Sequence, residues 1–327
     1  MKKTLLSLGG LAVAACLGYF GFSGHEISQI LDGVSEIVES GSGAGSGRSD
    51  VSENGEGKSG APAARTKKTA AGQSQERKME LPAALKGTRE KIIEHTGFTL
   101  SFNSDHNNPN WVAWELTADE AECEGSRSDE FFPDPMVPES HRVTTFDYKG
   151  SGYDRGHMCP AADMRWSPDA MHDCFYLSNI CPQVHALNGG GWQVLEKACR
   201  RWALQEGAVY VICGPVYGRF GGVEAVRGLA GSGKTLELNP SRKPKAIGSE
   251  HVVTVPDGFF KCVLSLKKGH EKAIAFYYSN NDKSQTMSSA AVSVDDIEAL
   301  TGMDFFVNLD NSLERRLESS YSLKLWN

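Results

Sequence analysis

The stretch Tyr153–Arg201 organises the chain. It reads YDRGHMCPAADM over residues 153–164, FYLSNICPQ over 175–183 and LNGGGWQVLEKACRR over 187–201. These segments contain a histidine, asparagines, a glutamate and several arginines. Such side chains supply a base near neutral pH, oxygen ligands for a hard cation and cationic partners for phosphate, so the stretch predicts phosphate chemistry.

The same stretch predicts two extended segments followed by a helix. The first lies around Asp154–Met158, and the second is the apolar run Phe175–Ile180, which Pro182 would end. Apolar side chains then recur at helical spacing and predict a helix from about Gly191 to Ala203. The residues that set this spacing are Trp192, Leu195, Cys199 and Trp202.

Hydrolysis of a phosphodiester needs a base for the attacking water and positive charge near the leaving oxygen. His157 suits the base because an unperturbed imidazole titrates near neutral pH. Mg²⁺, with Mn²⁺ as a substitute, needs few protein oxygens, so Asn188 together with waters and substrate would suffice. Glu196 could orient a metal-bound water, while Arg155 and Arg200 could bind phosphate. Two strands and a helix would close these groups around one ion.

At this point the sequence resembles the DNA/RNA non-specific endonucleases, the ββα-metal (His-Me) finger group. The matching residues are Asp154–His157, Ser178–Ile180, Pro182, Gln183, Leu187, Asn188, Gly190, Trp192, Leu195, Glu196 and Arg200. Weaker similarity extends from about Phe98 to the C-terminal region. The resemblance implies an α+β fold with a mainly antiparallel central sheet flanked by helices. The run Gly189–Gly191 departs from the pattern and predicts a later helix start, because glycine is a poor helix former.

The resemblance also implies roles for individual residues. It makes His157 the general base, Asn188 the magnesium ligand and Glu196 the holder of a metal-bound water. Arg155 and Arg200 would contact phosphate, Asn179 would support the site, and Arg127 would be a substrate-side arginine. The implied activity is hydrolysis of DNA and RNA with little sequence preference.

Several of these residues have plainer interpretations. DRGH alone could be a turn with a core histidine, although the accompanying residues favour catalysis. Asn179 and Asp154 could simply fix the backbone, and Arg127 could be a surface residue. We interpret His172 and His185 as polar loop residues. Two other functions compete with hydrolysis: a silent nucleic-acid-binding module, and an exported nucleotide hydrolase.

The last competitor depends on Gly228–Thr235, which satisfies the phosphate-loop pattern. A working phosphate loop follows a buried strand and opens a helix. The preceding GGVEAVR is a poor strand, and Pro240 and Pro244 oppose a helix. We therefore interpret this segment as an insertion without nucleotide-binding function.

The N-terminal region predicts export. Lys2 and Lys3 precede an apolar run, so residues 1–23 read as a signal peptide or a membrane anchor. Cys16 lies in a sequence that resembles a lipoprotein cleavage box. The expected location is extracytoplasmic: periplasmic, secreted or membrane-anchored.

Two further segments precede the folded domain. Residues 24–40 have helical apolar spacing, typical of a stalk, a self-association seam leading to a homodimer, or a membrane-surface helix. Residues 41–80 are rich in Gly, Ser and Ala and predict a disordered linker. The endonuclease domain is then expected over 81–327.

The remaining pattern predicts an α+β domain. Expected strands are 111–116, 208–213, 252–255, 259–266 and 273–278, and Ser293 and Gly302 would bound a helix over 294–301. The chain of 327 residues has a formal charge of −7, so binding of DNA and RNA would need a local basic groove.

The chain has eight cysteines. After export, an oxidising compartment would favour at least one disulfide. A zinc cluster of Cys159, Cys174, Cys181 and Cys199 is disfavoured, because their spacings lack CxxC pairs.

Overall fold

The computed structural model describes residues 78–218, 226–229 and 245–327. The predicted signal or anchor, the amphipathic segment and nearly all of the linker lie outside these residues, as does most of the phosphate-loop pattern. Within the described ranges, no helix has the length and apolar character needed to span a membrane.

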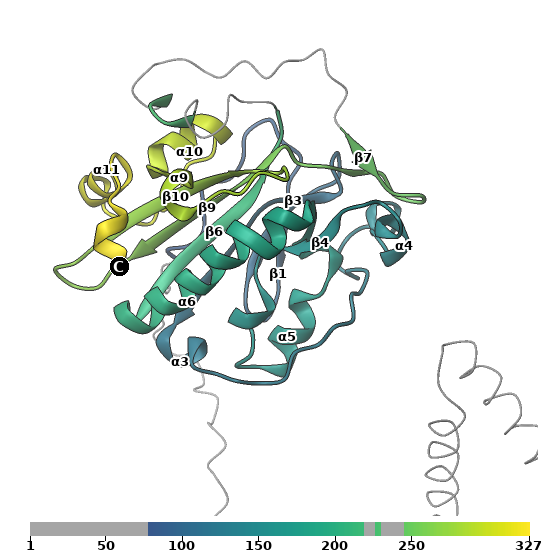
Figure 1. Cartoon of the computed structure of the whole chain (residues 1–327), viewed down its shortest axis with the longest axis horizontal. Helices are drawn as coiled ribbons and strands as arrows, with labels where there is room; N and C mark the ends of the chain where they lie inside the picture. The colour runs from purple at the N-terminus through teal and green to yellow at the C-terminus, as the bar shows by residue number, and fades with distance from the viewer. Residues whose placement is uncertain (1–77, 219–225, 230–244) are drawn as a thin grey trace, which may run out of the picture. The chain divides into compact units, whose positions relative to one another are not determined.

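A seven-stranded antiparallel sheet forms the centre of the molecule, in the order β1-β2-β3-β6-β9-β10-β11 (Figure 1). Its strands are β1 (Lys91–Glu94), β2 (Thr99–Asn103), β3 (Asn108–Thr117), β6 (Ala208–Val216), β9 (Gly258–Ser265), β10 (Lys272–Ser279) and β11 (Ala291–Val292). This confirms the predicted α+β class with an antiparallel central sheet.

The sheet is buried on both faces, and alternation along β3 shows how the sequence achieves this. Trp114 and Leu116 point into one apolar core, whereas Trp111 and Ala113 point into the other. Successive side chains of a strand point to opposite faces, so an almost continuous apolar strand fits a sheet that is covered on both sides.

Helix α6 (Gln193–Glu206) lies across one face of the sheet (Figure 1). Its Leu195, Cys199 and Trp202 join the core on that face. The other core includes Ile297 of α10 (Val294–Thr301) and Leu317 of α11 (Asn311–Glu318).

Helix α10 has the predicted bounds. The Ser293 side chain accepts a hydrogen bond from the Asp296 backbone N–H, and Gly302 follows in the left-handed conformation with φ 72°. Both ends are set by local chemistry, which a sequence displays directly.

The prediction for Phe175–Ile180 was wrong. Helix α5 (Pro168–Cys174) ends just before this run, a 3-10 turn occupies Leu177–Asn179, and the strand is β5 (Ile180–Gln183). The run is apolar because it is buried, not because it is extended. Pro182 lies inside β5 because β4 (Asp154–His157) and β5 form a two-stranded ribbon, in which proline can face an unpaired edge.

Two other bounds differ from prediction. Strand β6 continues through Gly214 and Pro215 to Val216, because β9 still pairs with it there. The segment expected as a strand over 252–255 is only β8 (Val253–Thr254), which pairs with β7 (Ala246–Ile247) outside the main sheet.

The cysteines of the described residues are all free thiols. Cys123 is partly exposed, and the other six are buried. The expected disulfide is therefore absent among these seven, which instead serve as small apolar core side chains. They form no zinc cluster: in the described part of the chain, only Asp295, Glu298 and Glu318 offer converging ligand atoms.

Candidate active site

The site is built on a ββα unit. Strand β4 pairs antiparallel with β5, with His157 opposite Ile180 and Gly156 opposite Cys181. A Cβ atom on Gly156 would lie 2.1 Å from Oε1 of the buried Gln183, so the glycine of DRGH lets that side chain cross the ribbon. After β5, a π-helical turn over Leu187–Trp192 leads into α6.

The π-helical turn explains the late helix start. Gly190 leaves the helical conformation, and α6 begins at Gln193 rather than near Gly191. A Cβ atom on Gly191 would lie 2.6 Å from the Gln285 carbonyl oxygen. Trp192 donates its indole N–H to the His157 carbonyl oxygen at 3.2 Å. The glycines thus let the turn pack tightly while the tryptophan ties it to β4.

His157 is half-buried between two aromatic rings, at centroid distances of 4.9 Å from Phe175 and 5.4 Å from Phe131. Its Nε2 is buried and has no hydrogen-bond partner in the described structure, and this is not the case for Nδ1. Burial, together with the charges of Arg127 and Arg155, lowers the pKa of His157 to about 3. The ring is therefore neutral, with Nδ1 as its accessible acceptor, and is a weaker base than an unperturbed imidazole.

Asn188 is oriented by Asp154. Its Nδ2 donates to Asp154 Oδ2 at 2.9 Å, and the same oxygen lies 2.8 Å from Nδ1 of His185. Because a carboxylate only accepts hydrogen bonds, the amide nitrogen must face Asp154, and Oδ1 of Asn188 is left without a described donor. A neutral oxygen held in this way fits a hard divalent cation such as Mg²⁺. Asp154 therefore belongs to the site, and the exposed His185, interpreted as a polar loop residue, contacts Asp154 but not Asn188.

Glu196 and Arg200 lie one turn apart on α6. Burial raises the pKa of Glu196 to about 7, even though Lys261 and Arg200 act against the rise. Arg200 Nη1 lies 2.8 Å from Oδ1 of the fully buried Asp163, whose Oδ2 accepts from Trp114 Nε1 at 3.2 Å. One end of Arg200 is thus fixed inside the protein, and 19% of its side chain remains exposed for a phosphate.

Two exposed arginines flank His157. The Arg155 guanidinium lies 4.4 Å from the Phe131 ring centre, and that of Arg127 lies 5.9 Å from the Phe175 ring centre. Both rings contact His157. The structure therefore brings Arg127 to the site, which its sequence position alone left open.

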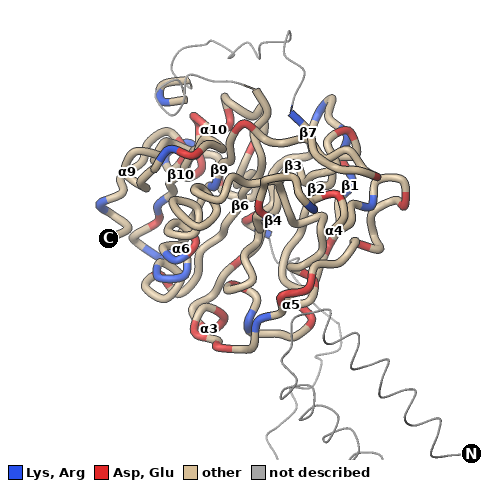
Figure 2. The backbone as a smooth tube through the Cα atoms, turned by 45° about the vertical axis from the view of Figure 1, so that its right-hand side comes forward, with Lys and Arg blue, Asp and Glu red and all other residues tan. Residues whose placement is uncertain are grey.

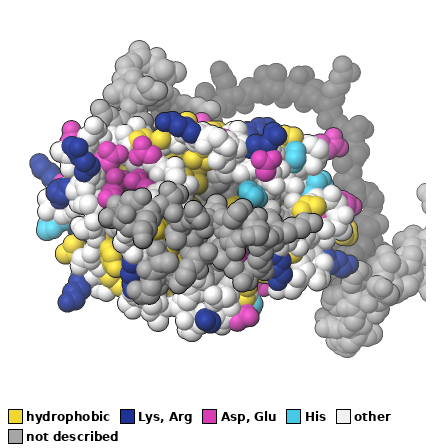
Figure 3. All heavy atoms as spheres, turned by 90° about the horizontal axis from the view of Figure 1, so that it is seen from above, with side chains coloured by type: hydrophobic (Ala, Val, Ile, Leu, Met, Phe, Trp, Pro, Cys, Tyr) yellow, Lys and Arg dark blue, Asp and Glu magenta, His cyan; other side chains and the backbone are white. Residues whose placement is uncertain are grey.

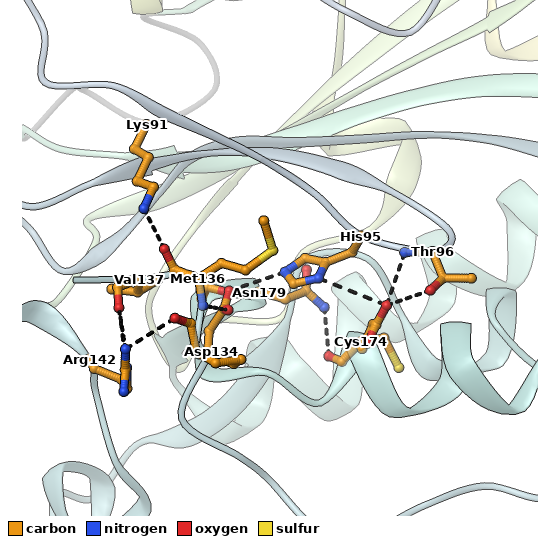
Figure 4. Close-up of polar contacts among 12 residues, drawn as sticks. Lys91, His95, Thr96, Asp134, Met136, Val137, Arg142, Cys174 and Asn179 are labelled. Atoms are coloured by element: carbon orange, nitrogen blue, oxygen red, sulfur yellow. Dashed lines mark hydrogen bonds and ion pairs between the residues drawn. The ribbon is translucent and has the colours of Figure 1, made fainter. Parts of the chain in front are cut away.

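Asn179 does not face substrate. It is fully buried, its Oδ1 accepts from the Cys159 N–H at 2.9 Å, and its Nδ2 donates to the Cys159 and Cys174 carbonyl oxygens. The resemblance implies that Asn179 supports the site, and both polar groups of its side chain are hydrogen-bonded to the backbone. It clamps the chain that follows His157 to the end of α5. Figure 4 shows its amide beside Cys174.

A neighbouring network fixes the same segment from the other side. His95 lies 3.1 Å from Asp134, which also accepts from Ser178 Oγ at 2.5 Å, and Asp173 accepts from both polar groups of Thr96 (Figure 4). This network holds the 3-10 turn before β5, so it supports the ribbon from outside the site.

An open cavity of ≈ 590 Å³ adjoins the site. Asn188, Asp154 and Arg155 line it together with the aromatic residues Phe131, Phe146, Tyr148 and Tyr153. Phe146 is 65% exposed. Acidic and basic residues are mixed along the described backbone (Figure 2) and on the face that Figure 3 draws.

Sequence patterns missed Asp163, Trp114 and Lys261. Asp163 lies inside the quoted stretch, but nothing in its spacing assigns it to Arg200. Lys261 is fully buried and interrupts the apolar run of β9, which was a detectable signal.

Known proteins resemble this chain over most of the described residues. The family model for DNA/RNA non-specific endonucleases matches residues 78–312. The chain is 31% identical to "Nuclease 1, mitochondrial" of Schizosaccharomyces pombe over 250 residues, covering 72% of each chain. It is 32% identical to "Endonuclease G, mitochondrial" of Bos taurus, covering 67% of this chain and 70% of the relative. It is 34% identical to "Nuclease C1" of Cunninghamella echinulata var. echinulata, covering 69% and 86%.

A solved structure agrees with these relatives. The crystal structure of the EndoG/EndoGI complex superposes with a TM-score of 0.63 at 27% identity, covering 75% of this chain and 96% of that chain.

Proposed function

The chain belongs to the DNA/RNA non-specific endonuclease family and is a nuclease. We propose that it hydrolyses DNA and RNA with Mg²⁺ or Mn²⁺ bound at Asn188. The observation that carries the proposal is the amide of Asn188, which Asp154 turns so that Oδ1 can bind a cation. A bound divalent cation would supply Lewis-acid stabilisation of charge on the phosphate oxygens.

His157 acts as the general base through Nδ1, which takes a proton from the attacking water. The chain provides two conditions for this step. The ring is neutral without substrate, and after burial, the largest cause of its low pKa, the charges of Arg127 and Arg155 lower it further. Phosphates bound to these arginines would offset both charges, so the pKa of His157 would rise toward the working pH when substrate arrives.

Glu196 and Arg200 have different roles in this proposal. A carboxylate at Glu196 would orient a water of the cation, and Arg200 would donate from its exposed end to a phosphate oxygen. Because Asp163 already fixes the other end of Arg200, little freedom is lost when a phosphate binds.

Little sequence preference follows from these contacts, since groups that bind phosphate carry no base information. The aromatic residues of the cavity add stacking surfaces that accept any base. Tolerance of both sugars is therefore expected.

We also propose export, supported by Lys2, Lys3 and the apolar run after them. Fractionation of cells that express the full chain would test it, because protein confined to the cytoplasm would contradict export. The same N-terminal segment, if retained, would attach the chain to a membrane. Residues 24–40 are the proposed seam of a homodimer, which light scattering with and without them would test.

Supercoiled plasmid and single-stranded RNA, each incubated with the full chain in Mg²⁺ or in EDTA, provide the central test. Both should be degraded only with the metal, and more slowly as salt rises. Binding without cleavage under every metal condition would instead favour the silent binding module. Discrete bands from one recognition sequence, unaffected by salt, would contradict the lack of preference.

A further inference from the structure

Lys261 is fully buried and forms no ion pair among the described residues. It lies on β9, where Phe259 and Val263 on the same face belong to the core covered by α6. Its Nζ has no hydrogen-bond partner in the described structure. Lysine is rarely buried completely, because removal of an ammonium group from water is costly unless other charges compensate.

Two tryptophans enclose this ammonium group. Nζ lies 4.4 Å from the Trp192 ring centre and 5.2 Å from the Trp114 ring centre. The faces of both rings are negative, so they attract a cation and replace part of its hydration.

The titratable groups around Lys261 come from three elements. They are Asp163 in the 3-10 turn Ala161–Asp163, Glu196 and Cys199 on α6, and Cys213 on β6. Burial lowers the pKa of Lys261, but these neighbours outweigh burial and raise it. The lysine is therefore charged and faces the two carboxyl groups that the site uses.

Each tryptophan also contacts the site directly. Trp192 donates to the His157 carbonyl oxygen, and Trp114 donates to Asp163, which holds Arg200. Lys261 is therefore linked to His157 through the ring of Trp192. Through the ring of Trp114 it is linked to Asp163, the carboxylate that binds Arg200.

We propose that Lys261 is a positioning residue of the active site, a buried cation that favours the ionised forms of Asp163 and Glu196 and holds Trp114 and Trp192 against the two halves of the ββα unit. The inference rests on the proposed nuclease function. Two buried carboxyl groups that face one another oppose each other's ionisation, and a second cation beside Arg200 offsets this repulsion. Protonation of Asp163 would loosen Arg200, and protonation of Glu196 would remove its charge from the metal-bound water.

The test compares Lys261→Met with Lys272→Met in the full chain. Lys272 is a matched control on the adjacent strand β10: its Nζ lies 4.7 Å from the Trp326 ring centre and 2.8 Å from Glu206, away from the site. Plasmid nicking with Mg²⁺ is measured between about pH 5.5 and 9.5, and thermal unfolding is measured for each variant. The charges of Lys261, Arg200 and Arg127 lower the pKa of Glu196, whereas that of Asp163 raises it. Loss of the Lys261 charge should therefore raise the pKa of Glu196.

Lys261→Met should lose about fivefold of the rate at pH 7 and recover as pH rises, because the acidic limb of its profile moves up by about one unit. Lys272→Met should lower the unfolding temperature without moving the limb. A limb that stays in place in folded Lys261→Met would show a merely structural lysine and overturn the inference.

A second variant covers the case in which Lys261→Met does not fold. Lys261→Arg keeps the charge, so its acidic limb should match the wild type even at reduced rate. A moved limb in Lys261→Arg would contradict a role based on charge. A wild-type chain that cleaves nothing with any divalent metal would refute the proposed function and this inference together.

Discussion

At the scale of single residues, neighbours rather than residue type decide the chemistry of the site. His157 would be a base near neutral pH in water, but two aromatic rings and two arginines lower its pKa to about 3. Asn188 would be an ordinary polar residue, but one carboxylate oxygen of Asp154 selects which end of its amide is free.

His157 and Asn188 should fail in different ways. His157→Ala should lose about a hundred- to ten-thousand-fold of the rate, as general bases do, yet still bind Mg²⁺ or Mn²⁺. Asn188→Ala should bind metal weakly and recover part of its activity at high metal concentration. Calorimetric metal titration with plasmid nicking would measure both. Loss of metal binding in His157→Ala, with normal binding in Asn188→Ala, would reverse the assigned roles.

Asp154 and His185 contact each other but should not be equally important. Asp154→Ala removes the acceptor that orients Asn188, so half-maximal activity should need about ten- to a hundredfold more metal. His185→Ala is the control, because its side chain is 88% exposed and it does not touch Asn188. Equal metal dependence in the two variants would contradict the orienting role of Asp154.

At the scale of elements, the site depends on how the π-helical turn connects β5 to α6. Gly191 approaches the carbonyl of Gln285 and the ring of Tyr278, whereas a Cβ atom on Gly189 would meet only His185, at 4.0 Å. The turn therefore has one glycine with no room for a side chain and another with ample room.

Gly191→Ala should destabilise the fold by about 1–3 kcal/mol through overpacking and also reduce nicking, because the turn carries Asn188. Gly189→Ala should leave the unfolding temperature nearly unchanged. Thermal unfolding and nicking of both variants would check this. A fully stable and active Gly191→Ala would mean that the turn can shift without consequence.

Sequence patterns predicted elements with local signals and missed those set by packing. The bounds of α10 were correct because Ser293 and Gly302 fix them through the adjacent backbone. Phe175–Ile180 was misassigned because burial, not strand pairing, makes it apolar.

The site shows the same division. The motif pointed to His157, Asn188, Glu196 and Arg200, which lie on β4, the π-helical turn and α6 within one short stretch of the chain. The pairing of Arg200 with Asp163 has no signal in spacing. The lysine inside the apolar run of β9 was a signal, but the two tryptophans that enclose it come from distant parts of the chain.

At the scale of the whole molecule, a second group of acids affects stability. Burial and neighbouring acids raise the pKa of Glu318 to about 9. They also raise the pKa of Glu298 to about 7, although a backbone hydrogen bond acts against that rise. Both lie above the ordinary glutamate pKa of 4.5, so the folded chain binds more protons than the unfolded chain above that pH. Stability should therefore fall as pH rises from about 4.5 through these two values.

Glu318→Gln should remove much of this loss. The variant should exceed the wild type by about 1 kcal/mol or more near pH 9 and match it more closely near pH 5, because only the ionised form is penalised. Urea unfolding in EDTA across pH would measure the difference. Glu122→Gln, at an exposed position, is the control, and an unchanged pH dependence in Glu318→Gln would contradict the prediction.

The six buried thiols have a consequence for where this domain can fold. With six of its seven described thiols buried and unpaired, the domain should need no oxidant, no isomerase and no disulfide exchange to reach its native state. Its folding should therefore not depend on the redox state of the compartment in which it folds. Active protein should form in a reducing host cytoplasm as readily as in an oxidising compartment.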